Sequence, residues 1–146
     1  MTKTPGSRRL HHIGIAVRSI AESLPHWTDG LGLELVSTDD VPAQGVRVAV
    51  LMAGPTRVEL IEPFGDDSPV AKHLEKRGPG VHHMAFEVED CQAAIDGMAA
   101  AGSPMIDRTP KPGAHDCRVA FVHPRGMDGV LTELVEDPNH GEASHG

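Results

Sequence analysis

The chain has 146 residues, a formal net charge of -8 and 39% hydrophobic residues, with one Trp, three Phe and no Tyr. This length predicts one domain with an aliphatic core. The negative charge argues against a nucleic-acid-binding or anionic-membrane-binding protein, because such proteins present a basic surface. No apolar run approaches the roughly 18 residues that span a bilayer, and no secretory signal is recognisable. We therefore expect a cytoplasmic protein whose Cys91 and Cys117 are reduced thiols.

The first half of the chain predicts a strand, a helix and three strands. Residues 1–9 are polar and predict a flexible arm. Ser19 and Glu22 fit a capping box that opens a helix to about Asp29, although Pro25 would kink it. Gly54-Pro55 indicates a hairpin turn. The expected strands cover 10–17, 33–37, 46–52 and 57–62, and 38–45 is expected to be a turn.

The second half repeats this order after a linker, 64–80, with a helix expected from Pro69 to Arg77 behind the cap Ser68. Asp90 is the expected cap of a helix that ends before Gly102. Strands are expected at 81–88, 104–108, 117–123 and 129–136, a loop at 109–116, and a disordered tail at 137–146. The fold class is therefore α+β, with two βαβββ modules at 10–63 and 81–136.

The two modules share a His near the start and a Glu near the end. Leu10–Val17 and Val81–Val88 both contain a His-His doublet, and both modules close on Glu-Leu. Strand alternation places His12 with Gly14 and Ala16, and His83 with Ala85 and Glu87, so this face of small side chains is expected to line a cavity. His11 and His82 fall on the opposite face, which we expect to be packed.

Glu59 and Glu133 lie in mid-strand, where burying a carboxylate is costly unless it is paired or binds a metal. Together with His12 and His83 they predict a site for one divalent first-row metal with open positions, more typical of Co, Mn, Ni or Fe than of a closed Zn site, although Zn stays open. His115 is a second candidate, in a loop able to cover the cavity. Candidate anion contacts are Arg47, Lys111, Arg118 and Arg125, although most such side chains are only solvated.

The segments just described, with the linker motif Asp67-Ser68-Pro69 and the turn His123-Pro124, resemble the vicinal oxygen chelate superfamily of glyoxalases, bleomycin resistance proteins and dioxygenases. The likeness covers about 10–136 and is closest to methylmalonyl-CoA epimerases. The segments that carry it are Leu10–Val17, Gln44–Val46, Val58–Pro63, Asp67–Lys72, Gly80–Phe86, Phe121–Pro124 and Gly129–Leu134.

The resemblance implies a U-shaped mixed sheet around one metal, with His12, Glu59, His83 and Glu133 at the ligand positions. It also implies interconversion of (R)- and (S)-methylmalonyl-CoA through a metal-stabilised enolate. Glu133 and Glu59 are the expected proton-transfer groups, an acyl-CoA is the expected small-molecule partner, and a homodimer is expected. Some epimerases carry a Glu where this chain has Val48.

Two other functions stay open from the sequence. A glyoxalase I-type lyase acting on glutathione hemithioacetals fits the four ligands equally well, whereas the linker and the His123-Pro124 turn favour the epimerase. A fourth protein ligand at Glu59 argues against an Fe(II) dioxygenase, which uses two His and one carboxylate. A metal-free small-molecule-binding protein of the same fold is the remaining alternative.

Overall fold

A computed structural model describes residues 7–139, with the side chains of Ser7 and Arg8 left undescribed. The described chain divides into two compact units. Unit 2 is the continuous stretch 12–82, and unit 1 combines 7–11 with 83–139. The chain therefore passes from one unit to the other between the two histidines of each doublet.

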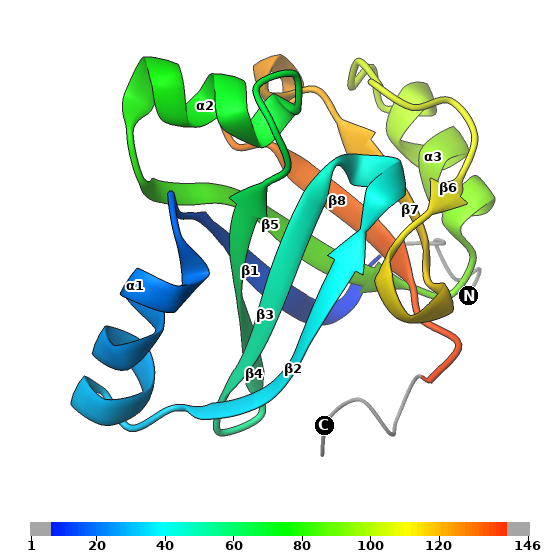
Figure 1. Cartoon of the computed structure of the whole chain (residues 1–146). Helices are drawn as coiled ribbons and strands as arrows, with labels where there is room; N and C mark the ends of the chain where they lie inside the picture. Colours follow the sequence, from blue (N-terminus) through cyan, green and yellow to red (C-terminus); the bar gives the residue numbers. More distant parts are fainter. Residues whose placement is uncertain (1–6, 140–146) are drawn as a thin grey trace. The chain divides into compact units, whose positions relative to one another are not determined.

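Unit 2 contains most of the first module (Figure 1). Strand β1 runs through both units, since its first five residues belong to unit 1. The elements are β1 (Ser7–Ala16), α1 (Ile20–Pro25), the π-helical turn η1 (His26–Gly30), β2 (Glu34–Val41), the 3-10 turn η2 (Pro42–Gln44), β3 (Val46–Ala53), β4 (Thr56–Pro63) and α2 (Pro69–Arg77).

Unit 1 contains the second module in the same order of elements. Strand β5 begins in unit 2 and continues into unit 1 from His83. The elements are β5 (Gly80–Val88), α3 (Cys91–Ala100), β6 (Lys111–Pro112), the 3-10 turn η3 (Ala114–Asp116), β7 (Arg118–Val122), the 3-10 turn η4 (Pro124–Gly126) and β8 (Thr132–Glu136).

The strand pairing is the same in both modules. In unit 2 the order is β2-β3-β4-β1, with β1 parallel to β4 and the other pairs antiparallel. In unit 1 the order is β6-β7-β8-β5, with β5 parallel to β8 and the other pairs antiparallel. The first and last strands of each module are therefore neighbours, which brings the His-bearing strand beside the Glu-bearing strand.

A helix covers one face of each four-stranded sheet. In unit 2, Ile20 packs with Ala49, Leu51, Val58 and Leu60. In unit 1, the α3 residues Cys91, Ala94 and Ile95 pack with Ala120, Val122 and Leu134. Because side chains alternate along a strand, Glu59 and Glu133 point away from these helices.

The helix starts follow the expected caps. Ser19 accepts a hydrogen bond from the Glu22 amide, Ser68 from Ala71 and Asp90 from Ala93. The bounds of α2 are those expected, and α3 ends one residue earlier than expected. Pro25 is the last residue of α1, and the following turn is π-helical, so the proline marks a change of helix type within the expected helix.

Several expected boundaries were wrong. Thr38–Val41, expected in a turn, belongs to β2 because it pairs with β3. Only Met105 makes a β-bridge within the expected strand 104–108, whereas β6 lies in the expected loop. Strand β8 begins at Thr132, three residues later than expected.

The expected arm and tail lie partly outside the described residues, at 1–6 and 140–146. Strand β1 begins at Ser7, so residues 7–9 belong to a strand and not to an arm. Asp137, expected in the tail, is buried, with 8% of its surface exposed. The ordered chain therefore extends beyond both expected ends.

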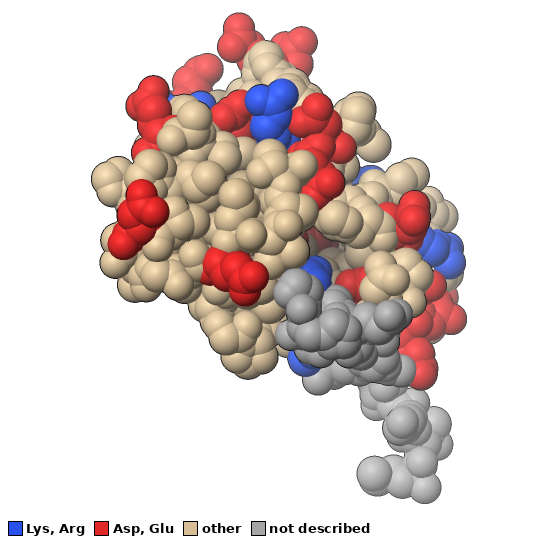
Figure 2. Space-filling model, turned by 60° about the horizontal axis from the view of Figure 1, so that its bottom comes forward, with Lys and Arg blue, Asp and Glu red and all other residues tan. Residues whose placement is uncertain are grey.

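Acidic side chains are spread among uncharged ones over the face in Figure 2, and the Lys and Arg visible there form no continuous patch. This distribution agrees with the formal net charge of -8. Among the described residues, no helix is both long enough and apolar enough to cross a membrane.

Candidate metal centre and active site

His12 and Glu59 form a pair within unit 2. Strand β1 carries His12, and its register with β4 places Gly14 beside Glu59, so both side chains point to the face opposite α1. His12 Nδ1 lies 3.4 Å from Glu59 Oε2. The His12 residue is 5% exposed and the Glu59 side chain 13% exposed. Unit 2 therefore holds a mostly buried imidazole and carboxylate side by side.

His83 and Glu133 form the corresponding pair within unit 1. The register of β5 and β8 places Ala85 beside Glu133, which gives the same relative position as in unit 2. His83 Nε2 lies 3.0 Å from Glu133 Oε1. Both residues are buried, at 5% and 4% exposed. The repeat recognised in the sequence is thus a repeat of His–Glu contacts.

The spacing in each pair fits two ligands of one divalent ion. Two atoms each about 2.1 Å from an ion lie about 3.0 Å apart at a right angle and about 3.4 Å apart at a tetrahedral angle. The two contacts measure 3.0 and 3.4 Å. Neutral imidazole and carboxylate are donors that first-row divalent metals accept. Each pair is therefore chemically suited to contribute two ligands.

A second glutamate in each closing strand caps a helix. Glu62 Oε1 accepts a hydrogen bond from the Ile20 amide at 2.7 Å, at the start of α1. Glu136 Oε1 accepts one from the Cys91 amide at 2.9 Å, at the start of α3. Negative charge at a helix N-terminus is favourable, because it satisfies exposed N–H groups and complements the helix dipole. In each closing strand, one Glu therefore lies beside the predicted His ligand, and the other lies on the opposite face and caps the helix.

Phe121 forms one wall beside the unit 1 pair. Its ring packs edge-to-face on His83, with centroids 5.7 Å apart, and β7 pairs Phe121 with Glu133. The Lys111 ammonium lies 5.1 Å from the Phe121 centroid and 3.3 Å from Asp107. Lys111, an expected anion contact, therefore lies against the same ring that packs on His83.

Residues 11–121 match the glyoxalase/bleomycin resistance protein/dioxygenase superfamily. The chain belongs to this superfamily. An ethylmalonyl-CoA/methylmalonyl-CoA epimerase of Cereibacter sphaeroides is 39% identical over 130 residues, which cover 88% of this chain and 97% of the relative.

Two solved structures of the superfamily show the same fold. A methylmalonyl-CoA epimerase from Mycobacterium tuberculosis is 34% identical with a TM-score of 0.86, covering 94% of this chain and 93% of that one. A Streptomyces coelicolor methylmalonyl-CoA epimerase in complex with 2-nitronate-propionyl-CoA is 34% identical with a TM-score of 0.87, covering 91% and 99%. The expected glyoxalase-like α+β fold is confirmed.

The assignment of the opposite strand face to packing was wrong in part. His82, Met84 and Phe86 are half-buried, whereas His83 and Ala85 on the predicted cavity face are buried. His82 lies edge-to-face against His73 of α2, with centroids 4.9 Å apart. Partial burial, and then the charge of Arg77, lower the pKa of His73. The more buried face of β5 is therefore the one that carries the predicted ligand.

The sequence reasoning missed two further polar contacts in unit 1. His11 donates to or accepts from Asp137, with 2.8 Å between Nε2 and Oδ2, so His11 is not simply a packed side chain. Arg9 Nε donates to Glu87 Oε1 at 2.8 Å, and Glu87 is 1% exposed. Strand alternation could have identified Asp137, because it places Asp137 on the same face of the chain as Glu133 and Val135.

The remaining candidates lie away from these pairs or have acidic neighbours. Arg47 Nε donates to Asp40 at 2.9 Å, and this bond raises the pKa of Arg47. Arg118 lies 3.8 Å from Glu136. The Arg125 amide donates to His123 Nδ1, which stabilises the His-Pro turn. His115 is exposed in η3.

Proposed function

We propose that this protein is a methylmalonyl-CoA epimerase that interconverts the (R) and (S) forms of its substrate. The observation that carries the proposal is its 34–39% identity, over about nine-tenths of the chain, to proteins with this activity. The repeated His–Glu pairs support it, because removal of a proton beside a carbonyl needs stabilisation of the negative charge that develops.

We assign His12, Glu59, His83 and Glu133 as the metal ligands. Support comes from the chemistry of the donors, their burial and the spacing within each pair. A divalent metal supplies Lewis-acid stabilisation of oxygen atoms on which negative charge develops. Co, Mn, Ni, Fe and Zn all fit this donor set, so metal analysis has to identify the ion.

Glu133 and Glu59 are the proposed proton-transfer groups. A carboxylate accepts the α-hydrogen, and the C–H electron pair moves into the thioester carbonyl to form an enolate. Delivery of a proton to the opposite face then inverts the carbon. The walls of aliphatic side chains beside these carboxylates, such as Ile61 and Val135, limit access of water and so favour return of the proton to carbon.

The decisive test is exchange of the α-proton of methylmalonyl-CoA in deuterated water, followed by mass spectrometry together with analysis of the epimers. We expect exchange and epimerisation that disappear after chelation and return with added divalent metal. Glu133→Ala should lower the rate at least about 100-fold, the usual range for a general acid–base group. Glu75→Ala, on the exposed side of α2, is the matched control and should retain the rate.

The two alternatives give different results in the same samples. Turnover of a glutathione hemithioacetal without exchange on methylmalonyl-CoA would identify a glyoxalase I-type lyase and overturn the proposal. Absence of both activities and of stoichiometric metal after mild purification would favour a metal-free binding protein. The homodimer and the cytoplasmic location stay predictions, which sedimentation equilibrium and cell fractionation would test.

A further inference from the structure

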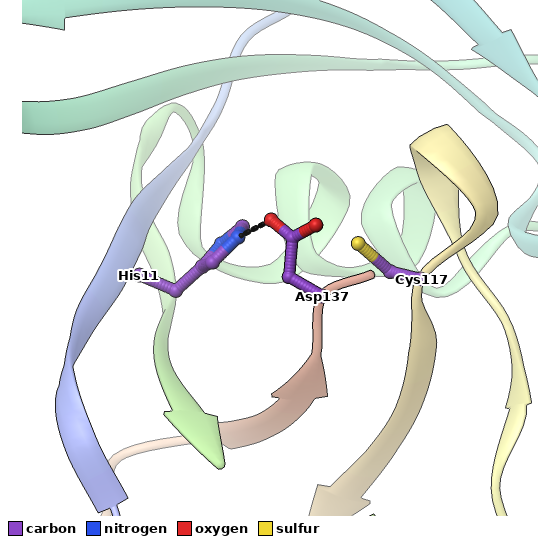
Figure 3. Close-up of side chains that lie close together, drawn as sticks. All are labelled: His11, Cys117 and Asp137. Atoms are coloured by element: carbon purple, nitrogen blue, oxygen red, sulfur yellow. Dashed lines mark hydrogen bonds and ion pairs between the residues drawn. The ribbon is translucent and has the colours of Figure 1, made fainter. Parts of the chain in front are cut away.

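His11, Cys117 and Asp137 form a second group of potential metal ligands, entirely within unit 1 (Figure 3). They come from β1, from the residue just before β7 and from the residue just after β8. Their ligand atoms lie within 4.8 Å of one another. All three residues are buried, at 7%, 7% and 8% exposed. An imidazole, a thiol and a carboxylate thus converge on one point in the protein interior.

The backbone holds two of these side chains in place. Asp137 Oδ1 accepts a hydrogen bond from the Asn139 amide at 2.8 Å, which orients Oδ2 towards His11. Cys117 follows His115 and Asp116, which both have positive φ values, 56° and 62°. Such backbone angles are uncommon outside glycine and are found preferentially at functional sites. The turn before Cys117 therefore has an unusual conformation that positions the thiol.

We propose that His11, Cys117 and Asp137 bind a borderline-soft divalent cation such as Zn²⁺. Thiolate, imidazole and carboxylate are the three ligand types of protein zinc sites, and their ligand atoms would need to lie about 3–4 Å apart. The distance between His11 Nε2 and Asp137 Oδ2, which is 2.8 Å, must increase slightly. The Cys117 sulfur must move closer to the other two ligand atoms, from which it is at most 4.8 Å away. On binding, the thiol proton leaves to solvent, and the neutral His11 imidazole carries its hydrogen on the ring nitrogen that does not bind the ion.

This site is separate from the His83–Glu133 pair, although both lie on the same face of the unit 1 sheet. Asp137 follows Glu133 by four residues, which corresponds to about 13 Å along an extended chain. One ion cannot contact both carboxylates at that distance. Cys117 also makes the second site chemically distinct, because the four ligands assigned to the first centre include no sulfur.

Cobalt(II) provides the test, since a cobalt–thiolate bond gives a near-ultraviolet charge-transfer band that nitrogen and oxygen ligands do not give. We would titrate Co²⁺ into the full-length, metal-stripped protein and record absorbance and bound metal together. We expect a thiolate band in the wild-type protein, and its loss in Cys117→Ser with one fewer equivalent bound. Cys91→Ser should retain the band, because Cys91 is the first residue of α3 and packs in the apolar core between this helix and the sheet.

Two further variants make the outcome decisive. His83→Ala should lose the metal of the first centre and keep the thiolate band. In Asp137→Asn the thiolate band should appear only at higher Co²⁺ concentration, because one ligand is weakened. Circular dichroism confirms that each variant is folded. Absence of the band in folded wild-type protein, or its persistence in Cys117→Ser, would overturn the proposal. The readout uses no substrate, so it does not depend on the proposed epimerase activity.

A different observation concerns Asp39, in unit 2. The antiparallel register places Asp39 directly across from Val48, and Val48 across from Ile61. Directly opposed side chains lie on the same face of a sheet. Because Ile61 and Glu59 are two residues apart on β4, Asp39 shares the face of Glu59 and His12. Its Oδ2 atom is buried.

Inversion at carbon requires proton transfer on two opposite faces of the enolate, and the epimerase activity proposed above therefore needs two groups. Among the other described carboxylates of the unit 2 strands, Glu62 faces α1 and caps it, Asp40 faces outward to Arg47, and Glu34 is exposed at the start of β2. Asp39 lies two strands away from Glu59, which leaves about 10 Å between strand axes for a substrate.

We also infer that Asp39 is the proton-transfer partner of Glu59, an inference that rests on the proposed function, refines the assignment made there and leaves Glu133 as a metal ligand. One Asp39 carboxylate oxygen removes the α-hydrogen of one epimer, and the C–H electron pair passes to the carbonyl. A protonated carboxyl on the other face then protonates carbon. In the reverse direction the same two groups exchange roles, and the protons balance over a full cycle.

The test compares Asp39→Asn with Asp40→Asn on each separate epimer in deuterated water. We expect Asp39→Asn to lose epimerisation at least about 100-fold and to retain deuterium exchange without inversion on one epimer. Asp40→Asn should keep both. Epimerisation within about twofold of wild type in folded Asp39→Asn would overturn the role of Asp39. Inactive wild-type protein would instead contradict the proposed function.

Discussion

The two helix-capping glutamates allow stability to be separated from catalysis. Glu136 is the better subject, because its hydrogen bond to the Cys91 amide joins β8 to α3 across 45 residues of sequence. We predict that Glu136→Ala destabilises the protein and leaves the His83–Glu133 pair in place, since Glu136 and Glu133 point to opposite faces of the sheet.

The magnitude follows from the two interactions with α3 that are lost, because the ion pair with Arg118 at 3.8 Å is solvent-exposed and contributes little. A hydrogen bond to a charged acceptor contributes about 1.5–3 kcal/mol, and the helix-dipole interaction about 0.3–1 kcal/mol. The Glu136 side chain is 30% exposed, so water replaces part of this bond in the variant. We therefore expect Glu136→Ala to lower the free energy of unfolding by about 2 kcal/mol. Glu136→Gln keeps a hydrogen-bond acceptor and should cost about half as much.

Urea unfolding followed by circular dichroism measures the change, with the midpoint shifting and the slope unchanged. Thermal unfolding should show a decrease of about 4–8 °C for Glu136→Ala. The exposed Glu75→Ala is the control and should stay within about 0.5 kcal/mol of wild type. A loss below 0.5 kcal/mol in Glu136→Ala, or loss of exchange activity with stability intact, would refute the assignment of Glu136 as a cap.

Four other outcomes are expected. Glu59→Gln should reduce bound metal and exchange activity with little loss of stability in the metal-free protein, measured by metal analysis and urea unfolding. Leu60→Ala should cost about 2–5 kcal/mol in the same unfolding assay, because Leu60 is fully buried. Burial raises the pKa of Cys91 to about 11 from 9.0, so native protein at pH 8 should resist alkylation there, and the stability contributed by the neutral thiol should be lost as pH rises from about 9 to about 11. Chelation should lower the melting temperature of wild type more than that of His83→Ala, because this variant has already lost the metal of the first centre and bound metal stabilises the folded state.

Local signals allowed the helices to be predicted from the sequence. Ser19, Ser68 and Asp90 each cap a helix through a hydrogen bond three residues on, which needs no partner from elsewhere in the chain. Strand ends were less predictable, because they depend on the neighbouring strand. Thr38 and Asp39 have turn-like sequence character and nonetheless lie in β2, since β3 supplies their hydrogen bonds.

The candidate site was predictable in so far as it repeats. His12 and His83 emerged from alternation and duplication, and each pairs with the expected glutamate. The contact of His11 was not predicted, because its partner Asp137 lies 126 residues away and was assigned to a tail. Contacts of that separation leave no periodic pattern in the sequence. Asp39 likewise gained significance only from its register with Val48.

The positions at which the chain changes units have a consequence for folding. Unit 2 is one continuous stretch, 12–82, whereas unit 1 needs residues 7–11 to meet residues that begin at 83. Closing a flexible loop of that length costs roughly 4 kcal/mol in chain entropy. If unit 2 folds first, its structure already fixes both ends of the loop, and unit 1 can form without that cost. During synthesis, unit 2 is also complete before the second His-His doublet has been fully added, so the order of translation matches the order that favours rapid folding.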